Sequence, residues 1–130
     1  MTTAPAAPPA SAATVGVPRW QRAYLIACVA VIGGAFAYWL PSWAQAPVLA
    51  YLPVERQWTF SPPTGSIAMM YVGLVLWGAA GALVGAGLGA AFGRLWPRPL
   101  SAPVLRLLGD WALTGFVLTG WYYTWSLWPF

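Results

Sequence analysis

The sequence carries very little charge and lacks the side chains most used in chemistry. Of 130 residues only 6% are charged, there is no histidine and no lysine, and Cys28 is the one cysteine. Soluble domains typically carry about 25% charged residues. Without histidine, the usual ligand of haem, zinc and copper and the usual general base are missing. The composition argues against a water-soluble surface and predicts a protein that is not an enzyme and holds no metal or cofactor.

Apolar residues make up 60% of the chain and gather in three long stretches. These stretches cover residues 23–40, 66–93 and 107–130, and only Asp110 interrupts the last one. About 20 helical residues cross a hydrocarbon core of about 30 Å. The sequence therefore predicts an all-α membrane protein with three transmembrane helices, at about 22–40, 66–94 and 105–127.

The segments outside these spans are rich in proline. Residues 1–18, MTTAPAAPPASAATVGVP, are of low complexity and predict a disordered tail, which leaves 19–130 as a single three-helix membrane domain. Residues 41–65 contain five prolines and two tryptophans. We expect this Pro/Trp-rich outer loop to lie on the bilayer surface, with a turn or short helix near 47–52 and an extended piece at 57–60.

Arginine is distributed unevenly along the chain. Five of the six arginines precede the first span or lie around the connection between the second and third, namely Arg19, Arg22, Arg94, Arg98 and Arg106. Positively charged residues are retained on the cytoplasmic side of a membrane. We therefore predict a multi-pass protein of the plasma membrane with its N-terminus in the cytoplasm and its C-terminus outside. Arginine without lysine, with abundant alanine, glycine and proline, indicates a high-GC bacterial source and hence a bacterial inner membrane.

Polar and aromatic residues near the span ends predict anchoring. Asp110 follows Arg106 by four residues, a spacing that allows an ion pair on one helix face, and it lies at the cytoplasmic edge instead of the membrane centre. Tryptophan favours the headgroup region. The third span ends in a group of tryptophans that we predict to anchor its outer end: Trp121, Trp125 and Trp128.

Glycine recurs at every fourth position of the second span. With Gly78, these residues form a stripe on one helix face, a glycine zipper: Gly81, Gly85, Gly89 and Gly93. In water each glycine would weaken a helix by about 1 kcal/mol relative to alanine. In a bilayer such a stripe allows two helix backbones to approach closely. The stripe therefore predicts a helix-packing surface.

Small residues line further faces when each residue is given 100° of helix rotation. A second seam that includes Gly73 and Gly87 lies roughly opposite the glycine stripe. The other two spans contribute small-residue faces as well: Ala27, Ala30 and Gly34 in the first, Ala112 and Gly115 in the third. Two opposed smooth faces suit a helix between two neighbours, so we expect the second span to be central. Its neighbours are the other two spans or a copy of the chain. The alternative is that alanine-rich spans form such seams by chance.

Two further interpretations concern the positive charge and the first span. The net charge of +4 is compatible with nucleic-acid binding, but arginines scattered between apolar spans form no basic patch, and we expect no nucleic-acid partner. Ala44-Gln45-Ala46 follows an apolar run and matches an A-x-A cleavage site, which would make the first span a signal peptide cleaved after Ala46. A retained span is favoured, because the apolar run is longer than a usual signal core.

Two classes of function remain. The preferred prediction is a small non-catalytic integral membrane protein, an accessory or assembly subunit that packs against other membrane subunits in the lipid bilayer. The alternative is a self-associating pore or small transporter built on the glycine-striped second helix. Channels usually line a span with polar groups, and the few hydroxyls of the third span are the only candidates for such a lining. The first class is therefore favoured.

Overall fold

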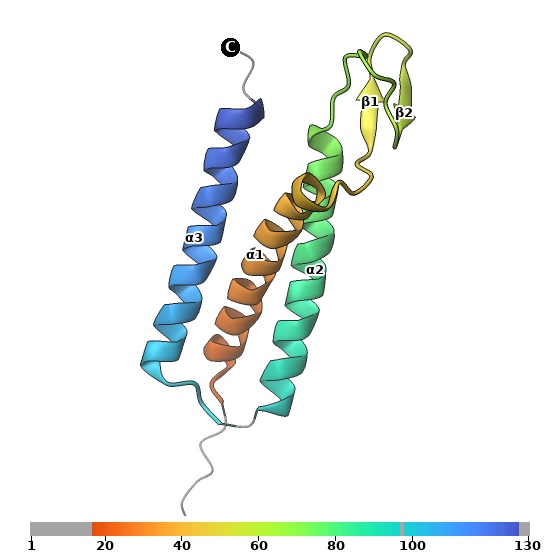
Figure 1. The fold of residues 1–130 in the computed structure, drawn as a ribbon. Coiled ribbons are helices and arrows are strands. Elements are labelled where there is room, and N and C mark those ends of the chain that lie inside the picture. Colours follow the sequence, from red (N-terminus) through yellow and green to blue (C-terminus); the bar gives the residue numbers. More distant parts are fainter. Residues whose placement is uncertain (1–16, 97, 128–130) are drawn as a thin grey trace, which may run out of the picture.

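The computed structural model describes residues 17–96 and 98–127, and the fold of these residues is mostly helical. Three helices and one small sheet follow one another in the order α1 (Arg19–Ala44), β1 (Ala50–Leu52), β2 (Gln57–Thr59), α2 (Tyr71–Leu95) and α3 (Ala102–Leu127) (Figure 1). Most of the predicted disordered tail and Trp128 lie outside the described residues. The prediction of a helical fold is confirmed.

Two of the described helices, α1 and α2, are long and apolar enough to cross a membrane. They have 26 and 25 residues, against the roughly 20 that a bilayer requires. The helix α3 is also 26 residues long and contains the third predicted span, whose crossing of the membrane stays a prediction. The helix α1 continues to Ala44 although Pro41 removes one backbone donor.

The helix α2 begins at Tyr71, five residues later than predicted. Met69 and Tyr51 form an antiparallel bridge in which two backbone hydrogen bonds of 2.9 and 3.1 Å join them. These bonds use both the N–H and the C=O of Met69, so the chain is extended there and cannot yet be helical. The hydroxyl and the backbone N–H of Ser66 both donate to the carbonyl oxygen of Pro63, at 2.7 and 3.2 Å, and close a turn over residues 63–66 before the helix begins.

The outer loop between α1 and α2 contains a β-hairpin. Strands β1 and β2 are antiparallel, and Tyr51 lies opposite Trp58 with the ring centroids 4.9 Å apart. The expected extended piece at 57–60 corresponds to β2. The expected turn or helix near 47–52 is wrong over Ala50–Leu52, because these residues pair with β2.

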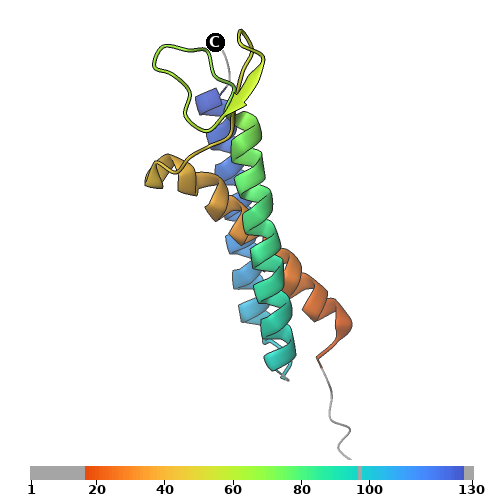
Figure 2. The same ribbon diagram turned by 90° about the vertical axis from the view of Figure 1, so that its right-hand side faces the viewer.

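The helix α1 lies between α2 and α3 (Figure 1). It crosses α2 obliquely and contacts it extensively (Figure 2), and it contacts α3 more sparsely. Over the residues that the structure describes, α2 and α3 form no extensive interface with each other. The expectation that the second span is central within the chain is therefore wrong. The reason is that α1 presents Gly33 and Gly34 to α2, and Ala35 and Trp39 to α3.

The two ends of the helical unit differ in charge. The start of α1, the end of α2 and the start of α3 meet at what we call the arginine end, which carries Arg19, Arg22, Arg94, Arg98 and Arg106. The hairpin, with Glu55 and Arg56, lies at the opposite end, which we call the hairpin end (Figure 1).

Candidate packing interface and adjoining hollows

The closest approach between elements joins the glycines of α2 to the middle of α1. A Cβ atom added at Gly81 would overlap the carbonyl oxygen of Gly33, and one added at Gly85 would overlap the carbonyl oxygen of Val29. The backbone of α1 thus occupies the space where a side chain would begin. These two positions require glycine because two helix backbones touch there.

The remaining glycines of the stripe follow the same line at greater separation. A Cβ atom at Gly89 would lie 3.0 Å from the Cα of Ile26, and one at Gly93 would lie 3.7 Å from Cδ2 of Leu25. Towards the hairpin end, a Cβ at Gly78 would lie 3.6 Å from the carbonyl oxygen of Gly34. The stripe therefore faces α1 throughout and is tightest at Gly81 and Gly85.

The helix α1 meets the stripe with a glycine pair. A Cβ at Gly33 would lie 2.6 Å from the carbonyl oxygen of Gly81, and one at Gly34 would lie 3.2 Å from the Cβ of Ala82. Ala30 lies beside Gly85, as the predicted face requires, whereas Ala27 is exposed. Gly33 was not among the predicted packing residues, although two consecutive glycines in an apolar stretch were a signal for it.

The two glycines of the second predicted seam have different surroundings. Gly73 is buried beneath Val48 and Leu49, where an added Cβ would overlap both residues. Gly87 is exposed, and an added Cβ would meet no atom of the described residues within 4 Å. Among the residues that the structure describes, only the Gly73 end of this seam is covered, and its cover is the loop before β1.

The contact between α1 and α3 uses larger side chains at its two ends. At the arginine end, the hydroxyl of Tyr24 donates a hydrogen bond of 3.1 Å to the carbonyl oxygen of Leu105. At the hairpin end, the rings of Trp39 and Tyr122 lie 4.4 Å apart, and the hydroxyls of Ser42 and Tyr122 share a hydrogen bond of 3.4 Å.

Small residues meet in the middle of the same contact. A Cβ at Gly115 would lie 3.2 Å from the Cβ of Ala35, and Ala112 is buried. Of the predicted face on α3, Gly115 thus lies towards α1, and Ala112 is buried. The helix backbones approach less closely here than at Gly81 and Gly85.

The predicted anchoring residues lie on the surface. The side chains of all five arginines at the arginine end are exposed, and so are those of Asp110, Trp121 and Trp125. The rings of Trp121 and Trp125 are stacked with centroids 6.1 Å apart. The ion pair between Arg106 and Asp110 stays a prediction.

Polar side chains that the sequence analysis did not single out fix the connections between elements. The buried Gln21 accepts a hydrogen bond of 3.2 Å from the backbone N–H of Leu100. The indole N–H of Trp77 donates to the carbonyl oxygen of Pro47 at 3.3 Å. Gln21 gave a sequence signal, because it is a polar residue next to an apolar stretch, whereas Trp77 lies inside the second apolar stretch and gave none. The hydroxyl of Tyr38 is buried and has no hydrogen-bond partner among the residues that the structure describes.

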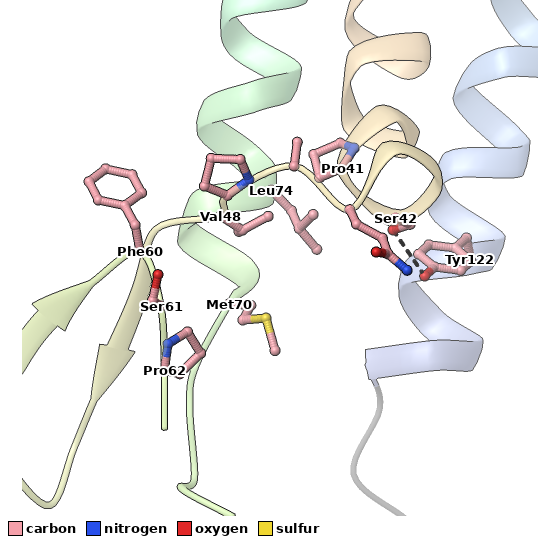
Figure 3. Close-up of a pocket in the computed structure, with 12 residues that line it drawn as sticks. Pro41, Ser42, Val48, Phe60, Ser61, Pro62, Met70, Leu74 and Tyr122 are labelled. Atoms are coloured by element: carbon pink, nitrogen blue, oxygen red, sulfur yellow. Dashed lines mark hydrogen bonds between the residues drawn. The ribbon is translucent and has the colours of Figure 1, made fainter. Parts of the chain in front are cut away.

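A hollow of about 540 Å³ lies at the hairpin end, where α1, the hairpin, α2 and α3 come together (Figure 3). Ser42 and Tyr122 contribute hydroxyl groups to one side, and Phe60 and Pro62 form the side towards the hairpin. These hydroxyl groups and the side-chain amide of Gln45, which also lines the hollow, can donate and accept hydrogen bonds, but they are neither strong acids nor strong bases. The hollow therefore offers a bound group hydrogen-bond donors and acceptors on one side and apolar contact on the other.

In residues 17–96 and 98–127, no three His, Cys, Asp or Glu side chains gather where a metal ion would need them. Cys28, buried in α1, is a free cysteine. The arrangement as a whole provides surfaces for packing and binding. Comparison of the chain with known protein families, with curated proteins and with solved structures finds no match.

Proposed function

We propose that the chain is a small non-catalytic integral membrane protein that serves as an accessory or assembly subunit, packing against other membrane proteins. In this proposal α3 spans the bilayer together with α1 and α2. The arginine end lies in the cytoplasm and the hairpin end outside, in accordance with the retention of positive charge on the cytoplasmic side.

The observation that carries the membrane location is the exposure of apolar helix surface. Only 22% of the most apolar stretch of α1, and likewise of α2, is buried inside the chain. On α2 the side chain of Leu83 is 76% exposed, and on α3 that of Phe116 is 68% exposed. The core helix of a soluble protein is covered by its neighbours, whereas surface of this kind calls for lipid or a protein partner.

Packing against other subunits is supported by the uncovered part of the second seam on α2, around Gly87. Gly87 is open to its surroundings, and Leu83 and Val84 beside it are 76% and 64% exposed. A small residue between larger ones gives a partner helix a groove that it can enter closely. The glycine stripe offers no such groove, because α1 of the same chain covers it. A ring built on the stripe would have to displace α1, which argues against the self-associating pore.

Purification of the tagged chain from its own membrane in mild detergent, followed by native mass spectrometry, tests the subunit role. We expect unlike membrane subunits in the complex, and a Gly87→Leu variant that loses them while staying folded. The control is Gly120→Leu on α3, where an added Cβ also meets no described atom within 4 Å. A homo-oligomer alone would favour the pore, and a lone monomer would contradict both proposals.

Cysteine labelling tests the orientation. Replacing Cys28 with alanine leaves no cysteine, so single cysteines introduced at Ser101 and Thr64 report on the two ends separately. A membrane-impermeant maleimide applied to intact cells should label the Thr64→Cys variant and leave the Ser101→Cys variant unlabelled. The opposite pattern would invert the proposed topology. The intact mass of the same samples shows whether residues 1–46 are retained, as we propose, or removed as a signal peptide.

A further inference from the structure

The arginine end contains an apolar groove between α2 and α3, with α1 beneath it. The volume of this groove is about 560 Å³, and the described residues that line it are all apolar. Its walls include Val29, Leu88, Phe92, Leu95, Val104 and Leu108. Because the described residues of α2 and α3 form no extensive interface with each other, the groove is open along its side.

Two arginines lie where this groove reaches the end of the helices. Arg22 and Arg98 both line a narrow hollow that continues from the groove and shares Leu25 and Phe92 with it. The hollow measures about 10 Å³, which is at most the space of one water molecule. Both arginine side chains are exposed, so a ligand would meet them at the rim of the hollow.

A hydrogen bond joins the two segments that carry these arginines. Gln21, which is buried in the first turn of α1, accepts it from the backbone N–H of Leu100. The bond ties the connection that carries Arg98 to the turn that carries Arg22. Trp96 lines the same hollow, and its ring is stacked on Phe92 at 5.6 Å. The groove therefore ends in a charged rim with an aromatic ring beside it.

We propose that this groove binds an anionic glycerophospholipid, with the phosphate on Arg22 and Arg98 and an acyl chain between α2 and α3. Guanidinium groups bind phosphate through paired, charge-assisted hydrogen bonds. Tryptophan favours the level of the headgroups. Between Leu88 and Leu95 the helix rises by about 10 Å, a length that accommodates the first part of an acyl chain. The inference rests on the proposed membrane location and is independent of the subunit role.

The distribution of the acidic residues agrees with an anionic ligand. Glu55 belongs to the hairpin end, and Asp110 lines neither the groove nor the narrow hollow. The field at the rim is therefore positive. Basic residues near a membrane surface attract anionic lipid, and basic pockets between spans bind anionic headgroups.

Native mass spectrometry of the purified full chain with two lipids of identical acyl chains tests this proposal. The probes are phosphatidylglycerol, which is anionic, and phosphatidylethanolamine, which has no net charge. We expect the chain to bind phosphatidylglycerol about tenfold more tightly, and the double variant Arg22→Gln/Arg98→Gln to lose that preference. The control is Arg94→Gln/Arg106→Gln, which has the same net charge but alters residues that line neither hollow, and it should keep the preference.

Further measurements distinguish binding of the whole lipid from binding of its headgroup alone, and loss of the site from misfolding of the protein. Glycerol phosphate in millimolar excess should not displace the lipid, because it lacks the acyl chain. Val104→Trp should fill the groove and weaken the binding of both lipids. The variant Arg22→Lys/Arg98→Lys keeps both positive charges and should keep part of the preference, which would show that substitution at these positions does not by itself destroy the site. Equal affinity of the wild-type chain for the two lipids, or an equal loss in both glutamine variants, would overturn the proposal. Neither outcome would alter the result of the subunit experiment.

Discussion

The two faces of α1 hold their neighbours by different means. On the side towards α2, glycine meets glycine and the helix backbones touch over Gly33, Gly81 and Gly85. On the side towards α3, the backbones stay further apart, and the contact depends on Tyr24 at one end and Tyr122 at the other. The first contact excludes side chains, whereas the second is built from them.

This difference predicts two levels of stability in one small protein. Closely packed backbones gain van der Waals contact along several turns and lose almost no side-chain entropy, because glycine has no side chain to order. The contact between α1 and α3 depends on the interactions of Tyr24 at one end and Tyr122 at the other, and these interactions can break one at a time. We therefore expect α1 and α2 to form the stable unit and α3 to separate from it first.

The largest effect is expected from a side chain placed between α1 and α2. In Gly85→Leu, the new side chain would overlap the carbonyl oxygen of Val29, so we expect the free energy of unfolding to fall by about 3 kcal/mol. Gly87→Leu, two residues away in the same helix, should leave the stability of the isolated chain nearly unchanged. Thermal unfolding in detergent, followed by circular dichroism, compares the two, and equal losses would contradict backbone contact at Gly85.

A smaller effect is expected at the hairpin end of the contact between α1 and α3. Tyr122→Ala removes the ring that lies on Trp39 and the hydroxyl that bonds to Ser42, with an expected loss of about 2 kcal/mol. Spin labels on α1 and α3 should report a longer and broader distance distribution. Tyr123→Ala, at an exposed position of the same helix, should leave that distribution unchanged. A change confined to α1 and α2 would reverse the proposed order of stability.

Removal of one hydroxyl should give a still smaller loss at the arginine end. Tyr24→Phe keeps the ring and deletes the hydrogen bond to the carbonyl oxygen of Leu105. We expect the melting temperature to fall by a few degrees and the N-terminal turns of α3 to exchange their amide hydrogens faster. Tyr71→Phe, at an exposed position at the start of α2, provides the reference. Unchanged exchange in α3 would show that this tether does not hold the helix.

The smallest effect, and one of opposite sign, is expected at Tyr38. Its hydroxyl is buried without a partner among the described residues, so Tyr38→Phe removes a polar group whose burial costs free energy. We expect the stability to stay equal or to rise by up to about 1 kcal/mol. A clear destabilisation, measured in the same unfolding experiment, would mean that this hydroxyl finds a partner in the membrane.

The sequence contained most of the information about the helices but less about how they associate. Apolar stretches placed α1 and α3 to within a few residues, because helix formation in a long apolar segment depends on local properties. The spacing of Gly81 and Gly85 indicated a close approach. It could not indicate which helix approaches, because any smooth surface fits such a stripe. The central position of α1 depends on Gly33, Ala35 and Trp39 acting together on different faces.

The outer loop was the least predictable part. Ala50–Leu52 is a strand because Gln57–Thr59 lies beside it, and the delayed start of α2 has the same kind of cause in the bridge between Tyr51 and Met69. Both depend on pairing with another segment of the chain, which the propensity and hydrophobic periodicity of one segment do not reveal. The groove at the arginine end was equally hidden, since Arg22 and Arg98 are far apart in the sequence and line one hollow only once the helices have packed.

The bridge from Tyr51 to Met69 makes the hairpin a mechanical extension of α2, because a single residue separates Met69 from the first turn of that helix. Trp77 reinforces this coupling through its bond to Pro47. Because the hairpin is joined to the start of α2 in this way, a change in the direction of α2 would move the hairpin with it.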